Sequence, residues 1–150
     1  MVMKWLLLAH VLATVVWVGG MFFAHQCLRP VVLAQFEPPF RLRLWNGVFG
    51  RFFPWVWAAV LLLMTSGQLL IGQLGGFATV PVHVHVMTAI GYLMVAIFIF
   101  IYFAPYAVLR RAVAAEEWPA AGAALNRIRI LVGTNLALGL LNIVLVFVLP

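Results

Sequence analysis

The sequence predicts an all-α integral membrane protein, folded as a four-transmembrane-helix bundle in a single domain over residues 1–150. The composition is the first reason, because 67% of the residues are hydrophobic and only 8% are charged, with a mean hydropathy of +1.16. A soluble chain of this length could not keep so apolar a surface dispersed in water. The second reason is that four apolar stretches each approach the ~20 residues that a helix needs to cross a bilayer.

The four expected spans cover about residues 5–27, 52–73, 80–104 and 130–149. The first span is longer than the apolar region of a signal peptide and no A-x-A-like cleavage site closes it, so we expect it to be retained. The second should open with Pro54 in its first turn, where a missing N–H costs little. Residues 28–51 contain three prolines and are interpreted as an interfacial, partly helical linker. Pro105 should kink the third helix at its end, and an amphipathic helix should follow it.

The basic residues predict the orientation of the spans. Apart from Lys4 at the N-terminus, they fall in the first and third connections, and the second connection has none. They are Arg29, Arg41, Arg43, Arg51, Arg110, Arg111, Arg127 and Arg129. By the positive-inside rule, the first and third connections are cytoplasmic and both termini lie outside.

The formal net charge of +6 does not indicate nucleic-acid binding, because the basic residues form no stripe with interleaved aromatic residues. The single cysteine, Cys27, excludes an internal disulfide and a CxxC pair. Catalytic triads, phosphate-binding loops and Cys/His zinc motifs are absent. Any chemistry therefore depends on the histidines and on the polar residues of the spans.

The first span carries a histidine deep in an apolar helix, which makes it a functional candidate by default. At helical spacing, one stripe that should face protein contains His10, Thr14, Trp17 and Met21. At 1.5 Å per residue, His10 lies roughly 7 Å below the start of its span, and His85 lies about 6 Å below the start of the third span. Both belong to the outer leaflet, whereas His25 lies at the opposite end of its helix.

Two facing imidazoles can hold a haem iron axially between the helices of a bundle. We therefore predict a haem b centre with a redox or electron-transfer role between His10 and His85. Both histidines lie near helix starts, where the helix dipole favours the neutral imidazole that can bind a metal. The further residues expected at the cofactor are Thr14, Trp17 and Tyr92.

Copper binding is the alternative. His83 lies two residues before His85, about 200° away around a regular helix, and its face continues into Met87 and Met94. Imidazole and thioether groups bind soft copper ions, so a copper uptake or resistance protein would use His83, His85 and Met87 at the outer mouth. The same methionines could instead face lipid, His83 could be an interfacial residue, and His10 could only hydrogen-bond to a neighbouring helix.

Two asparagines in the fourth span indicate a close helix–helix contact. Asn135 and Asn142 are seven residues apart with Gly139 between them, so the three share a face. A small residue between two amides suits close packing with interhelical hydrogen bonds. Ser66 and Gln68 lie late in the second span and should reach the same outer half of the bundle.

The stretch AHVLATVVWVGGMFFAHQCLRP, residues 9–30, resembles the first helix of small bacterial CopD-family membrane proteins, which are named for copper resistance. The similarity continues through RFFPWVWAAVLLLMTSG of the second span and HVHVMTAIGYLM of the third. It covers most of the chain. The resemblance implies a multi-pass protein of the bacterial inner (plasma) membrane that acts in copper uptake or resistance. In that membrane, the orientation given by the positive-inside rule makes both termini periplasmic.

The CopD family is similar in turn to the HemJ type of protoporphyrinogen oxidase, a four-helix haem b protein. A first-helix histidine of that type matches His10, and its third-helix His-x-Lys pattern falls on His83 and His85. Its lysine is thus His85 here, and its fourth-helix Arg-x-x-Asn-Glu pattern is missing from RIRILVGTN. The resemblance implies a haem site, and with it a haem-dependent membrane oxidoreductase; protoporphyrinogen oxidation is a further alternative.

The expected partners follow from these alternatives. Membrane lipid should surround the spans, and a redox centre would exchange electrons with a quinone or a small periplasmic species. A copper protein would instead meet a periplasmic copper partner. Four helices leave little protein to surround a haem, so a homodimer is compatible with the sequence.

Overall fold

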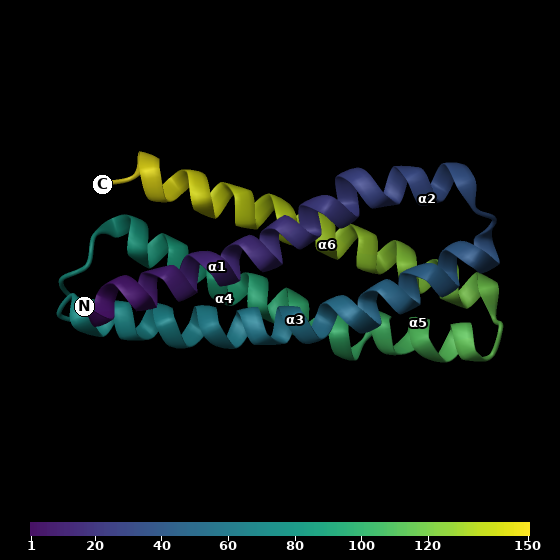
Figure 1. Ribbon diagram of the computed structural model, residues 1–150, viewed down its shortest axis with the longest axis horizontal. Coiled ribbons are helices and arrows are strands. Elements are labelled where there is room, and N and C mark those ends of the chain that lie inside the picture. The colour runs from purple at the N-terminus through teal and green to yellow at the C-terminus, as the bar shows by residue number, and fades with distance from the viewer.

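The computed structural model describes all 150 residues and forms an elongated bundle of helices with no β-strand (Figure 1). Its elements are α1 (Val2–Phe22), the π-helical segment η1 (Phe23–Leu28), α2 (Arg29–Gln35), α3 (Pro38–Gln73), α4 (Val82–Phe103), α5 (Pro105–Ala114) and α6 (Trp118–Val148). They form four rods, α1–η1–α2, α3, α4–α5 and α6, each long and apolar enough to cross a membrane. The predicted all-α bundle of four candidate spans is confirmed.

Both termini lie at one end of the bundle, beside the turn that joins α3 to α4 (Figure 1). We call this the termini end. The opposite end carries the α2–α3 and α5–α6 connections. We call it the arginine end because all eight arginines lie in the half of the bundle nearer to these connections. The side of the membrane that each end faces stays a prediction.

The first rod changes its helical type just before Pro30. A proline has no N–H, and its ring collides with the carbonyl of the residue four positions earlier, here Gln26. The helix widens to the π form over Phe23–Leu28 and then continues as α2. The first rod therefore runs beyond the boundary predicted at Cys27, and the widened turn holds His25.

α3 begins at Pro38, so the prediction that the second span opens at Pro54 is wrong. Pro38 starts the helix, whereas Pro54 lies inside its 36 residues. Aromatic packing explains why the helix continues through a proline, since buried contacts offset the lost hydrogen bond. One stripe of α3 buries Trp45, Phe49 and Phe53, with ring centroids 5.3 and 5.1 Å apart along it. Residues 28–51 are thus helical almost throughout.

Pro105 separates α4 from α5, as predicted. Ala104 has φ −106° and ψ −88°, outside the helical region, and α5 then packs along α6. α6 begins at Trp118, well before the span expected from residue 130. Its early turns bury Ala121 and Ile128 in the core that α5 shares, and this packing extends the helix.

The rods pack in two pairs that share an aromatic centre. α1 lies chiefly on α3, and α4 lies chiefly on α6. Trp17 of α1 meets Phe98 of α4 edge to face at 6.1 Å, and Phe98 meets Phe53 of α3 at 5.6 Å. Only 29 of the 150 residues are buried, and the outward faces remain apolar, as a lipid-facing surface requires.

Two glycines make the uncharged turn between α3 and α4. Gly75 and Gly76 have φ of 97° and 92°, values that residues with a Cβ rarely adopt. The hydroxyl of Thr79 lies 2.8 Å from the Leu74 carbonyl oxygen and closes the turn. The turn thereby returns the chain to the termini end, where α4 presents its histidines.

Candidate functional site

His10 on α1 is held by α3. Its Nδ1 lies 2.9 Å from Ser66 Oγ, and the Ser66 hydroxyl donates a hydrogen bond to the Leu62 carbonyl. Because serine has a single hydroxyl hydrogen, Ser66 must accept the Nδ1–H of His10, and Nε2 keeps the lone pair. Gly67 provides room for the ring, since a Cβ at that position would lie 3.3 Å from His10 Cε1. Nε2 is therefore the nitrogen of His10 that can bind a metal.

Thr14, Trp17 and Met21 continue from His10 into the bundle. The Thr14 hydroxyl donates to the His10 carbonyl at 2.9 Å and is used within its own helix. Trp17 and Met21 are each 3% exposed. The stripe faces protein, and Trp17 fills the centre of the bundle against Phe98.

α4 places its two histidines on different sides. His83 is half-buried, and its Nδ1 is buried without a hydrogen-bond partner. His85 is exposed, with its ring 5.8 Å from the ring of Phe77. Tyr92, on the same face as His85, is 51% exposed and accepts a hydrogen bond from Gln68 Nε2 at 3.0 Å. The His83 face of α4 therefore turns toward protein and the His85 face turns outward.

His10 and His85 have different partners in the structure. The polar contact of His10 is with Ser66, and the ring contact of His85 is with Phe77. No group of three or more His, Cys, Asp or Glu side chains lies close enough to hold a metal ion.

α6 sets α4 in register through the two predicted asparagine contacts. Asn142 Nδ2 donates to the Met87 carbonyl at 3.2 Å, and Asn135 Nδ2 donates to the Met94 carbonyl at 3.1 Å. Gly139 lies between them, where a Cβ would come within 3.1 Å of Met94 Cε. The expected close contact with interhelical hydrogen bonds is confirmed.

Two methionines of α4, Met87 and Met94, lie along this register. Together with Met64 of α3 and Met21 of α1, we call them the methionine row. Gly91 shares a face of α4 with Met87 and Met94, and Met64 Cε from α3 lies 3.9 Å from the position of a Cβ there. The Met94 methyl reaches Gly139 beside Val18 of α1, three residues before Met21. Met94 is only 4% exposed. This face of α4 therefore meets protein rather than lipid at Met94.

An apolar cavity of about 300 Å³ lies where the row reaches α1. Met21, Trp17 and Phe98 line it, and Asn135 borders it. Asn135 is 1% exposed, and its Oδ1 has no hydrogen-bond partner. A buried acceptor without a partner costs free energy, but the wall of the cavity is wholly apolar, so Asn135 Oδ1 does not open into it.

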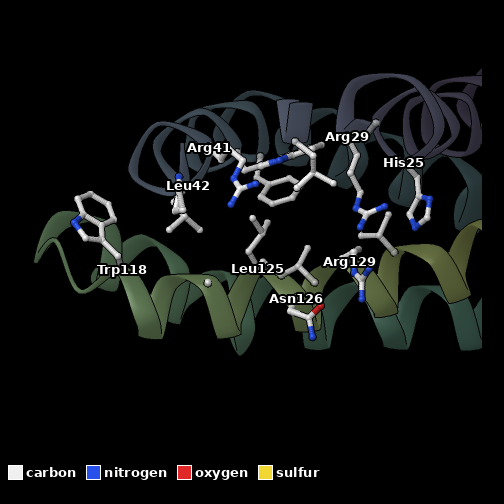
Figure 2. A pocket seen from close by; sticks show the side chains of 16 residues that line it. His25, Arg29, Arg41, Leu42, Trp118, Leu125, Asn126 and Arg129 are labelled. Atoms are coloured by element: carbon white, nitrogen blue, oxygen red, sulfur yellow. The ribbon is translucent and has the colours of Figure 1, made fainter. Parts of the chain in front are cut away.

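A second cavity, of about 270 Å³, lies at the arginine end (Figure 2). His25, Arg29, Arg41 and Arg129 line it together with apolar side chains of α3 and α6. His25 Nε2 lies 3.0 Å from the position of a Cβ at Gly133, so the ring packs closely against this glycine. This cavity was not predicted from the sequence, because the arginines were taken to indicate only the orientation of the spans. The leucines and aromatic residues between those arginines were the available signal.

Comparison with known proteins identifies a family for most of the chain. The family model for CopD, copper resistance protein D, matches residues 46–149. No curated protein and no solved structure matches the chain. The matched part contains His83, His85 and three residues of the methionine row, and it includes α4 and α6. With four membrane-spanning rods and this match, the chain is a multi-pass membrane protein that belongs to the CopD family.

Proposed function

We propose that the protein is a copper uptake or resistance protein that receives copper(I) at the termini end and holds it inside the bundle. The observation that carries the proposal is the register of α4 on α6. It is fixed by hydrogen bonds at the backbone of His83, Met87 and Met94. The family match supports copper as the metal.

The receiving residues are His85, His83 and Met87. His85 is exposed, so it can take an ion from outside the bundle. His83 has a buried Nδ1 without a partner, and Met87 follows it by one turn on the same face of α4. Imidazole and thioether ligands favour copper(I) over harder cations.

The interior residues continue this set of ligands. Met94 follows Met87 by seven residues, about 10 Å along α4, and Met64 reaches Gly91 between them. Met21 then lies at the cavity that Asn135 borders. The ion would thus move between thioether sulfurs.

The charges of the chain favour copper(I) over copper(II). The three acids, Glu37, Glu116 and Glu117, are exposed at the arginine end, so no carboxylate can neutralise a cation inside the bundle. Moving a monovalent ion into an interior of low dielectric costs of the order of 20 kcal/mol before ligands bind it, and the cost rises with the square of the charge. Neutral sulfur and imidazole ligands can offset only the smaller of these costs.

Haem b, with a haem-dependent redox role, is the second candidate. One observation favours it: the hydrogen bond from His10 to Ser66 leaves Nε2 of His10 able to bind iron. The second ligand would be His85, whose exposed position beside Phe77 gives this candidate less support than copper.

Metal analysis of the purified protein tests the proposal. The protein is expressed with copper and haem precursors supplied and purified in detergent. Copper, iron and the reduced-minus-oxidised visible spectrum are then measured on one sample. We expect near-stoichiometric copper without a haem b signal, and loss of copper in the double variant His83→Ala, Met87→Leu.

Met3→Leu is the matched control, because it removes a thioether that lies exposed outside the row. It should leave the copper content unchanged. Unchanged copper in the double variant would contradict the proposal. A sharp low-spin haem b spectrum with stoichiometric iron, abolished by His10→Ala, would establish the second candidate instead.

A further inference from the structure

The cavity at the arginine end gathers cationic side chains from separate helical segments. Arg29 belongs to α2, Arg41 to α3 and Arg129 to α6. Figure 2 shows Arg29, Arg41 and His25 on one side of the cavity, and Arg129 with Asn126 on α6 opposite them. The cavity is thus lined by positive charge on both sides.

None of these three arginines has a carboxylate partner. The one salt bridge of the protein joins Arg43 to Glu116 at 2.7 Å, and the two other acids form none. Arg29 and Arg41 are half-buried, so water and salt screen their charges less than at a free surface. Guanidinium groups that share a cavity repel one another, and a bound anion would remove this cost.

Most of the remaining lining is apolar. Leu42, Leu125 and Val132 contribute to it, and so does Leu33, which is 46% exposed on α2. The exposure of Leu33 means that apolar surface lies beside the cavity. A ligand with an anionic head and an apolar body would match both parts of the lining, whereas a free inorganic anion would match only one.

Trp118 forms the outer wall of the cavity and is held in place by two contacts of Arg43. The Arg43 guanidinium lies 5.0 Å from the centre of the Trp118 ring and also binds Glu116. These contacts tie α3 to the connection between α5 and α6. Tryptophan at such a position is typical of a membrane interface, which places the cavity at the depth of lipid headgroups.

We propose that this cavity binds the phosphate group of an anionic phospholipid. Arginine binds phosphate oxygens through two parallel N–H groups, and here Arg29, Arg41 and Arg129 all line the cavity. The positive-inside rule assigns this end to the cytoplasmic leaflet, where anionic lipids are attracted to basic pockets between helices. A cavity of about 270 Å³ takes the headgroup and the glycerol, while the acyl chains follow the surface beside Leu33. The proposal uses no residue of the methionine row and does not depend on copper binding.

The test measures lipid retention in nanodiscs made with phosphatidylcholine alone or with added phosphatidylglycerol. Native mass spectrometry of the full-length protein should show one retained phosphatidylglycerol. The double variant Arg29→Gln, Arg129→Gln should weaken its binding by roughly fivefold for each arginine, about 25-fold in all, since a basic residue contributes about 1 kcal/mol near an anionic membrane surface. The matched control is Arg51→Gln, Arg127→Gln, which removes two exposed arginines outside the cavity and should retain the lipid.

A second measurement keeps the proposal testable if the double variant does not fold. In the wild-type protein, raising the salt concentration should reduce phosphatidylglycerol retention, because salt screens charge attraction. Equal retention of phosphatidylglycerol and phosphatidylcholine at every salt concentration would overturn the proposal. It would also be overturned if inorganic phosphate displaced the lipid and stabilised the protein to the same extent, because the ligand would then be a free anion.

Discussion

The termini end and the arginine end of this bundle offer ligands of opposite kinds. At the termini end the functional groups are uncharged lone-pair donors: the imidazoles of His10, His83 and His85 and the sulfur of Met87. At the arginine end they are fixed cations around a cavity with no carboxylate partner. The first set suits a soft cation and the second suits an anion.

One apolar frame thus carries two unrelated kinds of proposed site. The same four rods and the aromatic centre formed by Trp17, Phe53 and Phe98 support both ends. The ends differ only in a few polar side chains that face inward. Function in a bundle this apolar therefore depends on which residues interrupt the packing, not on the packing itself.

Removing sulfur from the methionine row should have the largest effect. In Met87→Leu, Met94→Leu the side-chain volumes are nearly conserved, so the fold should survive. We expect the affinity for copper(I) to fall about 100-fold, the upper range seen when groups that support a bound metal are lost. Anaerobic competition with a copper(I) chelator measures this, with Met3→Leu as the control. A change of less than about twofold in the affinity for copper(I) would contradict metal binding by the methionine row.

Substitutions of two neighbouring glycines in α1 test the helix packing that supports both ends. A Cβ at Gly20 would lie 2.3 Å from the ring of Phe52, whereas a Cβ at Gly19 meets nothing within 4 Å. Gly20→Ala should lower the free energy of unfolding by about 2 kcal/mol through overpacking. Gly19→Ala should raise it by about 0.5 kcal/mol, because alanine favours a helix. Equal stability of the two variants, measured by denaturation in detergent, would contradict the packing of α1 on α3.

The hydrogen bond of His10 is tested by two adjacent hydroxyl groups. Ser66→Ala leaves Nδ1 of His10 without its partner and should cost about 1 kcal/mol in the free energy of unfolding. Thr65→Ala removes an exposed hydroxyl that forms hydrogen bonds only within α3. It should lower the free energy of unfolding by no more than a few tenths of a kcal/mol. The same unfolding assay separates them. A larger loss in Thr65→Ala would contradict the assigned role of Ser66.

Removing the salt bridge beside the cavity at the arginine end should have the smallest effect on stability. Arg43 and Glu116 are 51% and 67% exposed, and exposed pairs contribute about 0.5 kcal/mol or less. Arg43→Gln should therefore lower the thermal midpoint slightly at low salt and not at high salt. A large loss of stability that persists in high salt would show that Arg43 supports the fold in another way.

The parts of the fold that local chemistry determines were predictable from the sequence. Long apolar runs gave the four spans, Pro105 gave the break after α4, and the spacing of Asn135 and Asn142 gave their contacts with another helix. The start of α3 was not predictable, because Pro54 is a helix-start signal on its own. Only the tertiary packing of Phe49 and its neighbours carries the helix through it.

The rotation of α4 about its axis could not be predicted either, and the proposed copper site depends on it. α4 is apolar around its whole circumference, so its sequence carries little information on which face packs inward. The prediction paired His10 with His85 from their equal depth alone. The structure turns His83, Met87 and Met94 toward protein and leaves His85 exposed. Met21 and Met64 join them only through contacts between α1, α3, α4 and α6, which no local pattern shows.

Copper K-edge X-ray absorption on protein loaded anaerobically with copper(I) tests the central claim most directly. Our account predicts sulfur together with imidazole nitrogen among the nearest neighbours of copper. The sulfur contribution should fall in Met87→Leu, Met94→Leu and stay unchanged in Met3→Leu. Nitrogen and oxygen neighbours alone, or a wild-type sulfur contribution in the double variant, would contradict copper binding by the methionine row.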